Sequence, residues 1–243
     1  MNPRSIFDNV ISNLIWVAIV AIVGIIYKYY SSLNNLQWIL LSINIILIIV
    51  FFYYRHKLQI VTGILKVEQQ MKDGISPEKA LGLCKNNIKF LGIAANKLVN
   101  SPEFEKAIKR CNRPGKPIKF LLSSPDNIIL KHAARRENKE LNQFKEMVNS
   151  TLRKLVQLKQ ENGYNIEIRL YKSEKESGPP SFRLFFIDDT SVLVSYYIFG
   201  EGEGLQMPQI QIIKTKNKRD VENFYYAFEH YFNSLWETSE IYE

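Results

Sequence analysis

The chain has 243 residues, a formal net charge of +8 and only two cysteines. The length allows one domain of ordinary size with a smaller appendage. The two cysteines and three widely separated histidines have no metal-ligand spacing, which argues against a disulfide framework and against a metal site. We expect a protein of a reducing compartment with no metal and no cofactor.

Two apolar stretches open the chain, at residues 10–27 and 36–54, and neither carries a formal charge. Each is close to the ~20 residues that an α-helix needs to cross the hydrocarbon core of a bilayer. The short connection between them, residues 28–35, allows only a tight helical hairpin. More Lys and Arg residues flank the pair than lie in the connection, so the positive-inside rule places both termini in the cytoplasm. Residues 1–57 are therefore predicted to form a transmembrane hairpin.

Two other interpretations of these stretches have less support. A cleaved signal peptide would need a small-residue cleavage site, and no convincing one precedes Tyr27. A second apolar stretch also follows directly, which a signal peptide does not explain. Two buried core helices would rarely be so long and uninterrupted in tandem. The main polar residues inside the stretches either face a neighbouring helix, mediate assembly between subunits or line a path through the membrane. They are Ser12, Asn13, Ser42 and Asn44.

Residues 58–86 are predicted to form a helical stalk that could transmit a movement to the spans. Apolar positions within 58–72 indicate a helix that leaves the membrane and stops at Asp73-Gly74. Ser76 then has the chemistry of an N-cap, with Pro77 in the first turn of a second helix.

From Asn87 the pattern alternates between strands and helices, and it predicts a mixed sheet flanked by helices over residues 87–243. The apolar and aromatic stretch 181–200 is broken by the turn Asp188-Asp189-Thr190 and predicts two adjacent antiparallel strands, buried on both faces. The other predicted strands are 88–93, 117–122, 166–171 and 209–213. The predicted helices run from Ser101 to the turn at 112–115, through a long region ending at Asn162-Gly163, and from 219 to 236.

Charge is unevenly distributed along the chain. Residues 106–172 contain sixteen Lys and Arg against six Asp and Glu, whereas residues 173–243 contain six against twelve. A basic middle region favours a polyanionic neighbour if its charges gather on one surface. Lys-rich, solvated helix faces explain the same composition equally well.

The order and character of these elements resemble a single-repeat phospholipase D-like domain. The resemblance rests on Ile88–Ile93, Pro117–Pro125, Ile166–Tyr171, Phe182–Asp188 and Phe228–Trp236. In that superfamily one strand carries His-x-Lys and, after four more residues, Asp. The equivalent positions here are Ser181, Arg183 and Asp188. Because the family's nucleophile is the histidine, the resemblance implies a domain without catalytic residues.

The remaining side chains predict a phosphate-binding site. Arg183 can grip phosphate oxygens bidentately, and Ser181 and Asp188 complete the family positions. Ser123 and Ser124 end the second strand, where ligands of open α/β sheets tend to gather. Three cations begin the basic helix beside them: Lys131, Arg135 and Arg136. An Arg183 ion pair with Asp188 or Asp189 that only fixes the hairpin remains the alternative, as do exposed positions for the three helix cations.

The resemblance also implies partners and a function. Single-repeat members dimerise, so a homodimer or higher homo-oligomer is expected. A two-helix anchor on an inactive phosphodiesterase fold is similar to bacterial anti-phage effectors that sense a cyclic oligonucleotide and disrupt the inner membrane. We therefore expect a membrane effector that binds a nucleotide or another phosphate-bearing ligand and has no stable nucleic-acid partner. The alternatives are a membrane-bound phosphodiesterase, either a nuclease or a phospholipase, and a tethered nucleic-acid-binding module.

Overall fold

The computed structural model describes residues 23–24, 35–136, 138–173, 182–196, 206–215 and 223–243. The chain divides into two compact units, residues 1–55 and 56–243. The predicted first span, 10–27, lies outside the described residues except for Val23 and Gly24, which are helical.

One described helix, α2 (Asn35–Thr62), is long and apolar enough to cross a membrane. It covers the predicted second span, and none of its residues is buried in the protein. Ser42 Oγ donates to the Trp38 carbonyl at 2.9 Å, and Asn44 Nδ2 donates to the Leu40 carbonyl at 2.8 Å. Both polar groups therefore have hydrogen-bond acceptors within their own helix.

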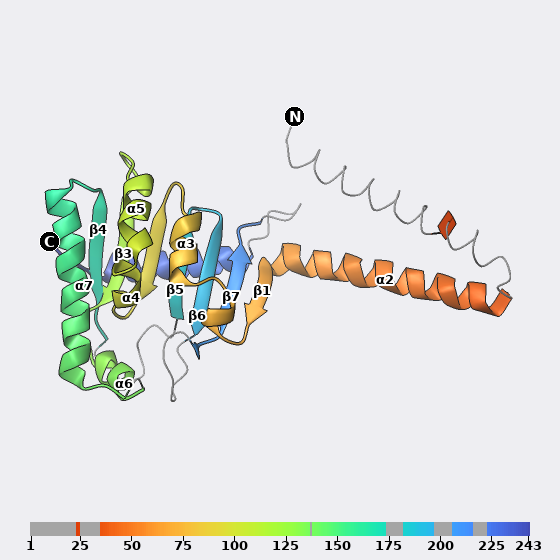
Figure 1. Cartoon of the computed structure of the whole chain (residues 1–243), viewed down its shortest axis with the longest axis horizontal. Coiled ribbons are helices and arrows are strands. Elements are labelled where there is room, and N and C mark those ends of the chain that lie inside the picture. Colours follow the sequence, from red (N-terminus) through yellow and green to blue (C-terminus); the bar gives the residue numbers. More distant parts are fainter. Residues whose placement is uncertain (1–22, 25–34, 137, 174–181, 197–205, 216–222) are drawn as a thin grey trace. The chain divides into compact units, whose positions relative to one another are not determined.

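The second unit is built on one eight-stranded sheet in the order β1-β7-β6-β5-β2-β3-β4-β8 (Figure 1). β2, β3 and β4 run parallel, and all other neighbours are antiparallel. The strands are β1 (Ile64–Glu68), β2 (Ile88–Gly92), β3 (Ile118–Ser123), β4 (Ile166–Tyr171), β5 (Phe182–Ile187), β6 (Ser191–Tyr196), β7 (Gln209–Ile213) and β8 (Glu240–Ile241). The predicted mixed sheet is confirmed, with the β5–β6 hairpin near its middle.

Helices cover both faces of the sheet. Figure 1 shows α3, α4, α5 and α7 over one face and α8 on the other. The described helices of this unit are α3 (Pro77–Leu83), α4 (Asn96–Val99), α5 (Pro102–Cys111), α6 (Ile129–Arg136), α7 (Leu141–Glu161) and α8 (Phe224–Thr238). A 3-10 turn, η1 (Met71–Asp73), follows β1. Two helices begin as predicted, because Ser76 Oγ accepts from the Lys79 amide and Ser101 Oγ from the Glu103 amide.

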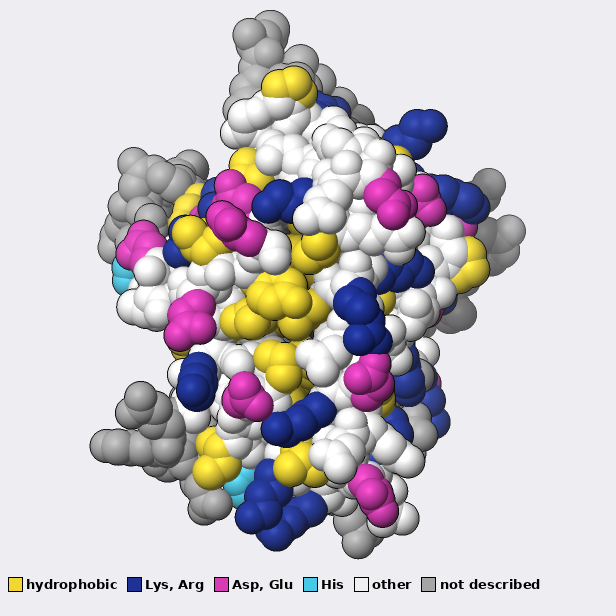
Figure 2. Space-filling view, turned by 90° about the vertical axis from the view of Figure 1, so that its left-hand side faces the viewer, with side chains coloured by type: hydrophobic (Ala, Val, Ile, Leu, Met, Phe, Trp, Pro, Cys, Tyr) yellow, Lys and Arg dark blue, Asp and Glu magenta, His cyan; other side chains and the backbone are white. Residues whose placement is uncertain are grey.

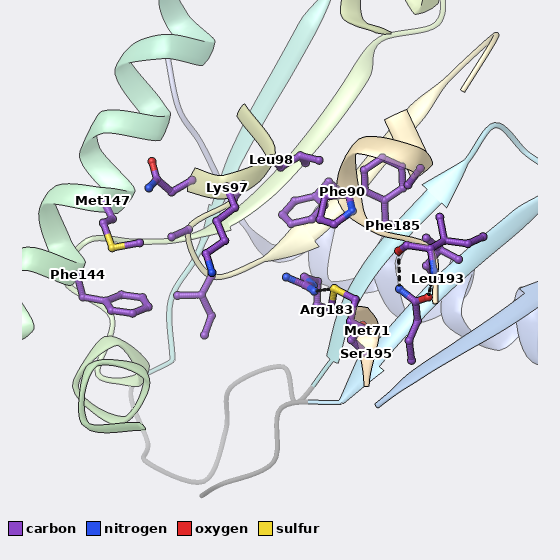
Figure 3. A pocket seen from close by; sticks show the side chains of 18 residues that line it. Met71, Phe90, Lys97, Leu98, Phe144, Met147, Arg183, Phe185, Leu193 and Ser195 are labelled. Atoms are coloured by element: carbon purple, nitrogen blue, oxygen red, sulfur yellow. Dashed lines mark hydrogen bonds between the residues drawn. The ribbon is translucent and has the colours of Figure 1, made fainter. Parts of the chain in front are cut away.

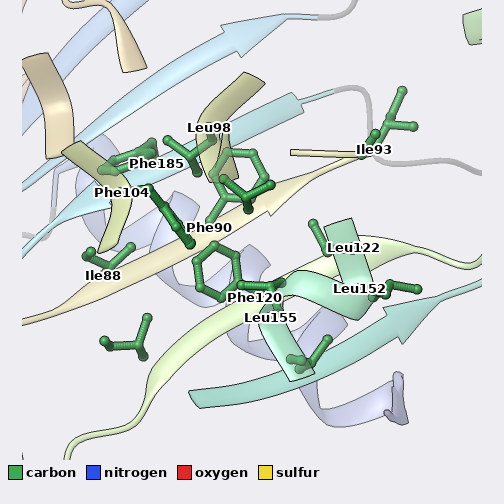
Figure 4. Packing of buried hydrophobic residues seen from close by; sticks show 14 of the residues in the cluster. Ile88, Phe90, Ile93, Leu98, Phe104, Phe120, Leu122, Leu152, Leu155 and Phe185 are labelled. Atoms are coloured by element: carbon green, nitrogen blue, oxygen red, sulfur yellow. The ribbon is translucent and has the colours of Figure 1, made fainter. Parts of the chain in front are cut away.

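Side chains alternate between two apolar cores along each central strand. In β2, for example, Phe90 belongs to the core under α3–α7, and Leu91 to the core under α8. Figure 4 shows the first core, where Phe90 packs against Phe120 and Phe185, with ring centroids 6.2 and 6.1 Å apart. The hairpin is therefore buried on both faces, as its sequence predicts.

The structure corrects the predicted stalk. The helix predicted over 58–72 ends at Thr62, where Gly63 takes a φ of 75°, and β1 follows instead. β1 pairs with β7, so this stretch is part of the sheet. The long helical region before Gly163 is also two helices, α6 and α7, and Asn138 between them has a φ of 51°.

Candidate functional site

A cavity of about 110 Å³ opens at one edge of the sheet, on the face covered by α3, α4 and α7. The carboxyl ends of β2 and β6 meet the amino ends of β5 and β7 there, because neighbours among these strands are antiparallel. Aromatic and aliphatic side chains form most of the lining, including Phe90, Phe144, Met147, Phe185 and Leu193 (Figure 3).

A row of polar side chains crosses three strands in the wall of this cavity. Arg183 on β5 is in register with Ser195 on β6, and Ser195 with Gln209 on β7. Ser195 and Gln209 are each only 2% exposed. The Gln209 side chain accepts from the Ile75 amide at 2.8 Å and donates to the Ile75 carbonyl at 3.0 Å. This pair of hydrogen bonds fixes the segment after η1 against the sheet.

Two cations line the cavity, Arg183 from β5 and Lys97 from α4. Figure 3 shows both side chains reaching into the same space from opposite sides. The Arg183 guanidinium donates to the sulfur of Met71, a residue of η1 that is 2% exposed. Among the described lining residues there is no Asp, Glu, His or Cys. The cavity thus combines positive charge with an apolar wall, which suits an anionic group attached to an apolar one.

Lys97 was missed by sequence reasoning, although a signal for it exists. It lies just beyond the predicted strand 88–93, and ligands gather at such strand ends. Ala95, the residue before α4, has a φ of 52°, and the chain turns there.

Asp188 does not share a site with Arg183. It lies at the other end of β5, in the turn to β6, with a φ of 53°. Its Oδ1 accepts from the amides of Lys85, Asn86 and Asn87 at 3.0, 2.7 and 3.0 Å. Asp188 therefore holds the loop before β2. It does not line the cavity, because the strand between the two residues separates it from Arg183 by roughly 17 Å.

The other predicted site residues do not line the cavity. Ser123 is fully buried at the end of β3 and its Oγ donates to the Ser124 carbonyl, while Ser124 Oγ accepts from the Asp126 amide, so both hydroxyls bond within the turn that follows. Lys131 and Arg135 are exposed on α6. Ser181 and the side chain of Arg136 lie outside what the structure describes.

The basic middle region does not produce a patch of one sign on the face seen in Figure 2. Lys and Arg side chains alternate there with Asp and Glu around a central apolar area. The pairing of β4 with β8 brings the acidic end of the chain beside its basic middle, with Leu170 opposite Glu240. Several surface cations are also paired, including Lys145 with Asp126 at 3.3 Å.

The described residues contain no group of three or more His, Cys, Asp or Glu that could hold a metal ion. Both cysteines are free and buried. Burial raises the pKa of Cys111 to about 11 and that of Cys84 further still, so neither is a thiolate nucleophile at neutral pH.

The similarities of this chain to known proteins are remote. No protein-family model matches the chain, and no curated protein matches it. One similar solved structure is TrmBL2, an archaeal chromatin protein with a novel mode of DNA binding, at 13% identity and a TM-score of 0.40, covering 98% of this chain and 67% of that one. Another is Nuc from Salmonella typhimurium, a phospholipase D family member, at 13% identity and a TM-score of 0.38, covering 69% and 88%. Both TM-scores are below 0.5, and neither similarity establishes a family.

Proposed function

We propose that this chain is a membrane-anchored sensor whose α/β unit binds a phosphate-bearing ligand in the cavity between Arg183 and Lys97. The observation that carries the proposal is the lining itself: two cations and no acidic side chain among the described residues. A phosphate would accept charge-assisted hydrogen bonds from both cations, and Arg can supply two from one guanidinium.

The size of the cavity defines which part of a ligand enters. A water molecule needs roughly 10–15 Å³ of such space, so about 110 Å³ takes on the order of ten waters. One phosphate and the group attached to it fit, whereas a whole cyclic oligonucleotide does not. For a nucleotide, the ribose or base beside the phosphate would pack on Phe144 and Met147, and the remainder would lie outside.

Part of the cavity wall is close in sequence to the membrane helix α2, so ligand binding could affect that helix. Met71 and Ile75 line it, and both belong to the segment that follows β1, while β1 follows α2 after a single residue, Gly63. A phosphate that takes hydrogen bonds from Arg183 competes with Met71 for the guanidinium. The ligand changes the state of α2 only to the extent that it binds one arrangement of this segment better than the other.

The wider role that we propose is that of a non-catalytic effector at the bacterial inner membrane, acting in anti-phage defence in response to a cyclic nucleotide. The absence of His, Asp, Glu and Cys among the described lining residues supports binding over hydrolysis. A homodimer or larger assembly would let ligand binding change how the membrane helices meet.

Calorimetry on the full chain in detergent tests the proposal, with inorganic phosphate, nucleoside monophosphates and cyclic di- and trinucleotides as titrants. Arg183→Gln and Lys97→Gln should each weaken binding about tenfold or more, since a hydrogen bond to a charged group contributes ~1.5–3 kcal/mol. Lys131→Gln, on exposed α6, is the matched control and should bind normally. Hydrolysis of a phosphodiester that depends on Arg183 would identify a phosphodiesterase instead, and an absence of binding by every titrant would refute the sensor.

A further inference from the structure

The sheet ends in an edge strand, β1, that exposes apolar side chains. Among the described strands, β1 pairs only with β7, so its outer edge has no strand partner. Leu65 and Val67 on β1 are 45% and 61% exposed. An open edge with apolar side chains is a template for pairing with another strand, and proteins usually protect such edges.

The charges of β1 are complementary to those of a second β1. If two copies run antiparallel about a two-fold axis at Val67, Lys66 of each copy lies opposite Glu68 of the other, and Val67 lies opposite Val67. Centring the axis on any other residue of β1 breaks this match. In the single chain, Lys66 and Glu68 form an ion pair with each other. The Lys66 side chain is exposed, whereas Glu68 Oε1 is buried and has to turn outward to meet a second copy.

We infer that two copies of this chain associate through their β1 edges, in the register with Val67 on the two-fold axis. The bulge at Leu65 limits the regular edge to the residues from Lys66 onward, so the contact is short and depends on the Lys66–Glu68 pairs. A second copy fits this surface better than an unrelated strand, because the pattern of charges is self-complementary.

The arrangement has a direct consequence for the membrane helices. Thr62, the last residue of α2, precedes Val67 by five positions. Five extended residues span at most ~18 Å, so the two helix ends in the dimer lie within roughly 40 Å of each other. Pairing of β1 would therefore bring the C-terminal ends of two α2 helices close together.

Disulfide trapping on the full chain in detergent tests the register. When a residue lies opposite the same residue of the second copy in an antiparallel pair, the two Cα atoms are ~4.5–5.5 Å apart, which a disulfide can bridge. Val67→Cys should therefore cross-link almost completely under mild oxidation. Leu65→Cys is the matched control: it is also exposed, but its two copies would lie about 14 Å apart along the strands and should not cross-link. The native cysteines are fully buried and do not compete.

Charge reversal supplies an independent measurement of the same interface. Lys66→Glu and Glu68→Lys should each weaken dimerisation at least tenfold by native mass spectrometry or light scattering, and the double reversal should restore it. Unchanged thermal melting would show that the single variants are folded. Equal cross-linking at positions 65 and 67, or a wild-type monomer, would overturn the inference. So would a monomer that uses Leu65 and Val67 only to bind lipid vesicles.

Discussion

Arg183 lies at the start of β5 and Asp188 directly after its last residue, so the two side chains lie at opposite ends of one central strand. The guanidinium faces the cavity, whereas the carboxylate accepts hydrogen bonds from three successive amides before β2. One residue thus lines the cavity, and the other stabilises the fold. Substitutions at the two positions should have separate effects.

Replacing Asp188 by Ala should lower the free energy of unfolding by ~2–4 kcal/mol without changing phosphate binding. The loss follows because three amides lose a charged acceptor, and an unsatisfied buried donor costs about 1–3 kcal/mol. Asp188→Asn keeps a side-chain oxygen and a residue type that tolerates positive φ, so it should lose less. Urea unfolding of both variants measures the loss of stability, and titration with phosphate measures whether binding is unchanged. Weakened phosphate binding by a folded Asp188→Asn protein would contradict it.

Gln209 should contribute to stability through its two hydrogen bonds to the Ile75 backbone. Gln209→Leu leaves a partly buried amide and a carbonyl without these partners, so the free energy of unfolding should fall by ~2–3 kcal/mol. Hydrogen exchange at the Ile75 amide should accelerate at the same time. Gln211 is a suitable control, because it is only partly buried on the same strand and Gln211→Leu should leave that amide protected.

Gly63 should not tolerate a side chain. Its φ is 75°, and a Cβ atom there would approach Asn223 Nδ2 to 2.5 Å and the Ile213 carbonyl oxygen to 2.6 Å. Gly63→Ala should therefore destabilise the second unit by at least ~1–2 kcal/mol. Gly82→Ala is the matched substitution: it lies in helix α3 with open space around it, so it should stabilise the protein by ~0.5–1 kcal/mol. Chemical denaturation of the two variants gives their free energies of unfolding. Equal effects of Gly63→Ala and Gly82→Ala would count against the positive φ and close contacts at Gly63.

Stability should decline as the pH rises above 9. Burial raises the pKa of Cys111 from 9.0 to about 11 in the folded protein. The unfolded thiol therefore ionises first and releases its proton, which favours the unfolded state between the two values. Tyr225 and Tyr231, whose pKa values burial also raises, add to the decline from pH 10 upward. Thermal melting between pH 9 and 10 measures the contribution of the thiols, because the tyrosines add to the decline only above pH 10. The variant Cys84→Ala/Cys111→Ala should show a smaller change of melting temperature over this pH range.

Strands with strong local patterns could be predicted from the sequence. The segments around Phe90, Phe120 and Ile168 combine apolar residues with nearby turn chemistry, and β5 and β6 are separated by a visible Asp-Asp turn. β1 was missed because its apolar residues fit a helical spacing as well as a strand. Its partner Ile212 is far along the chain, and local patterns carry no information about such pairing.

The site could be predicted only in part. Arg183 was identified from motif spacing, and it does line the cavity. Asp188 was assigned to the same site through the family pattern, although a strand of this length carries the two side chains to its opposite ends. Lys97, Ser195 and Gln209 come together through strand order and register, which become visible only in three dimensions.

The position of β1 also affects how the chain is made. This strand is synthesised directly after α2, whereas β7, its neighbour in the finished sheet, leaves the ribosome about 140 residues later. At ~5–20 residues per second that interval is on the order of 10 to 30 s. During this time the backbone N–H and C=O groups of the strand that later pair with β7 have no partner strand. Chaperone demand during biogenesis should therefore concentrate on this short segment.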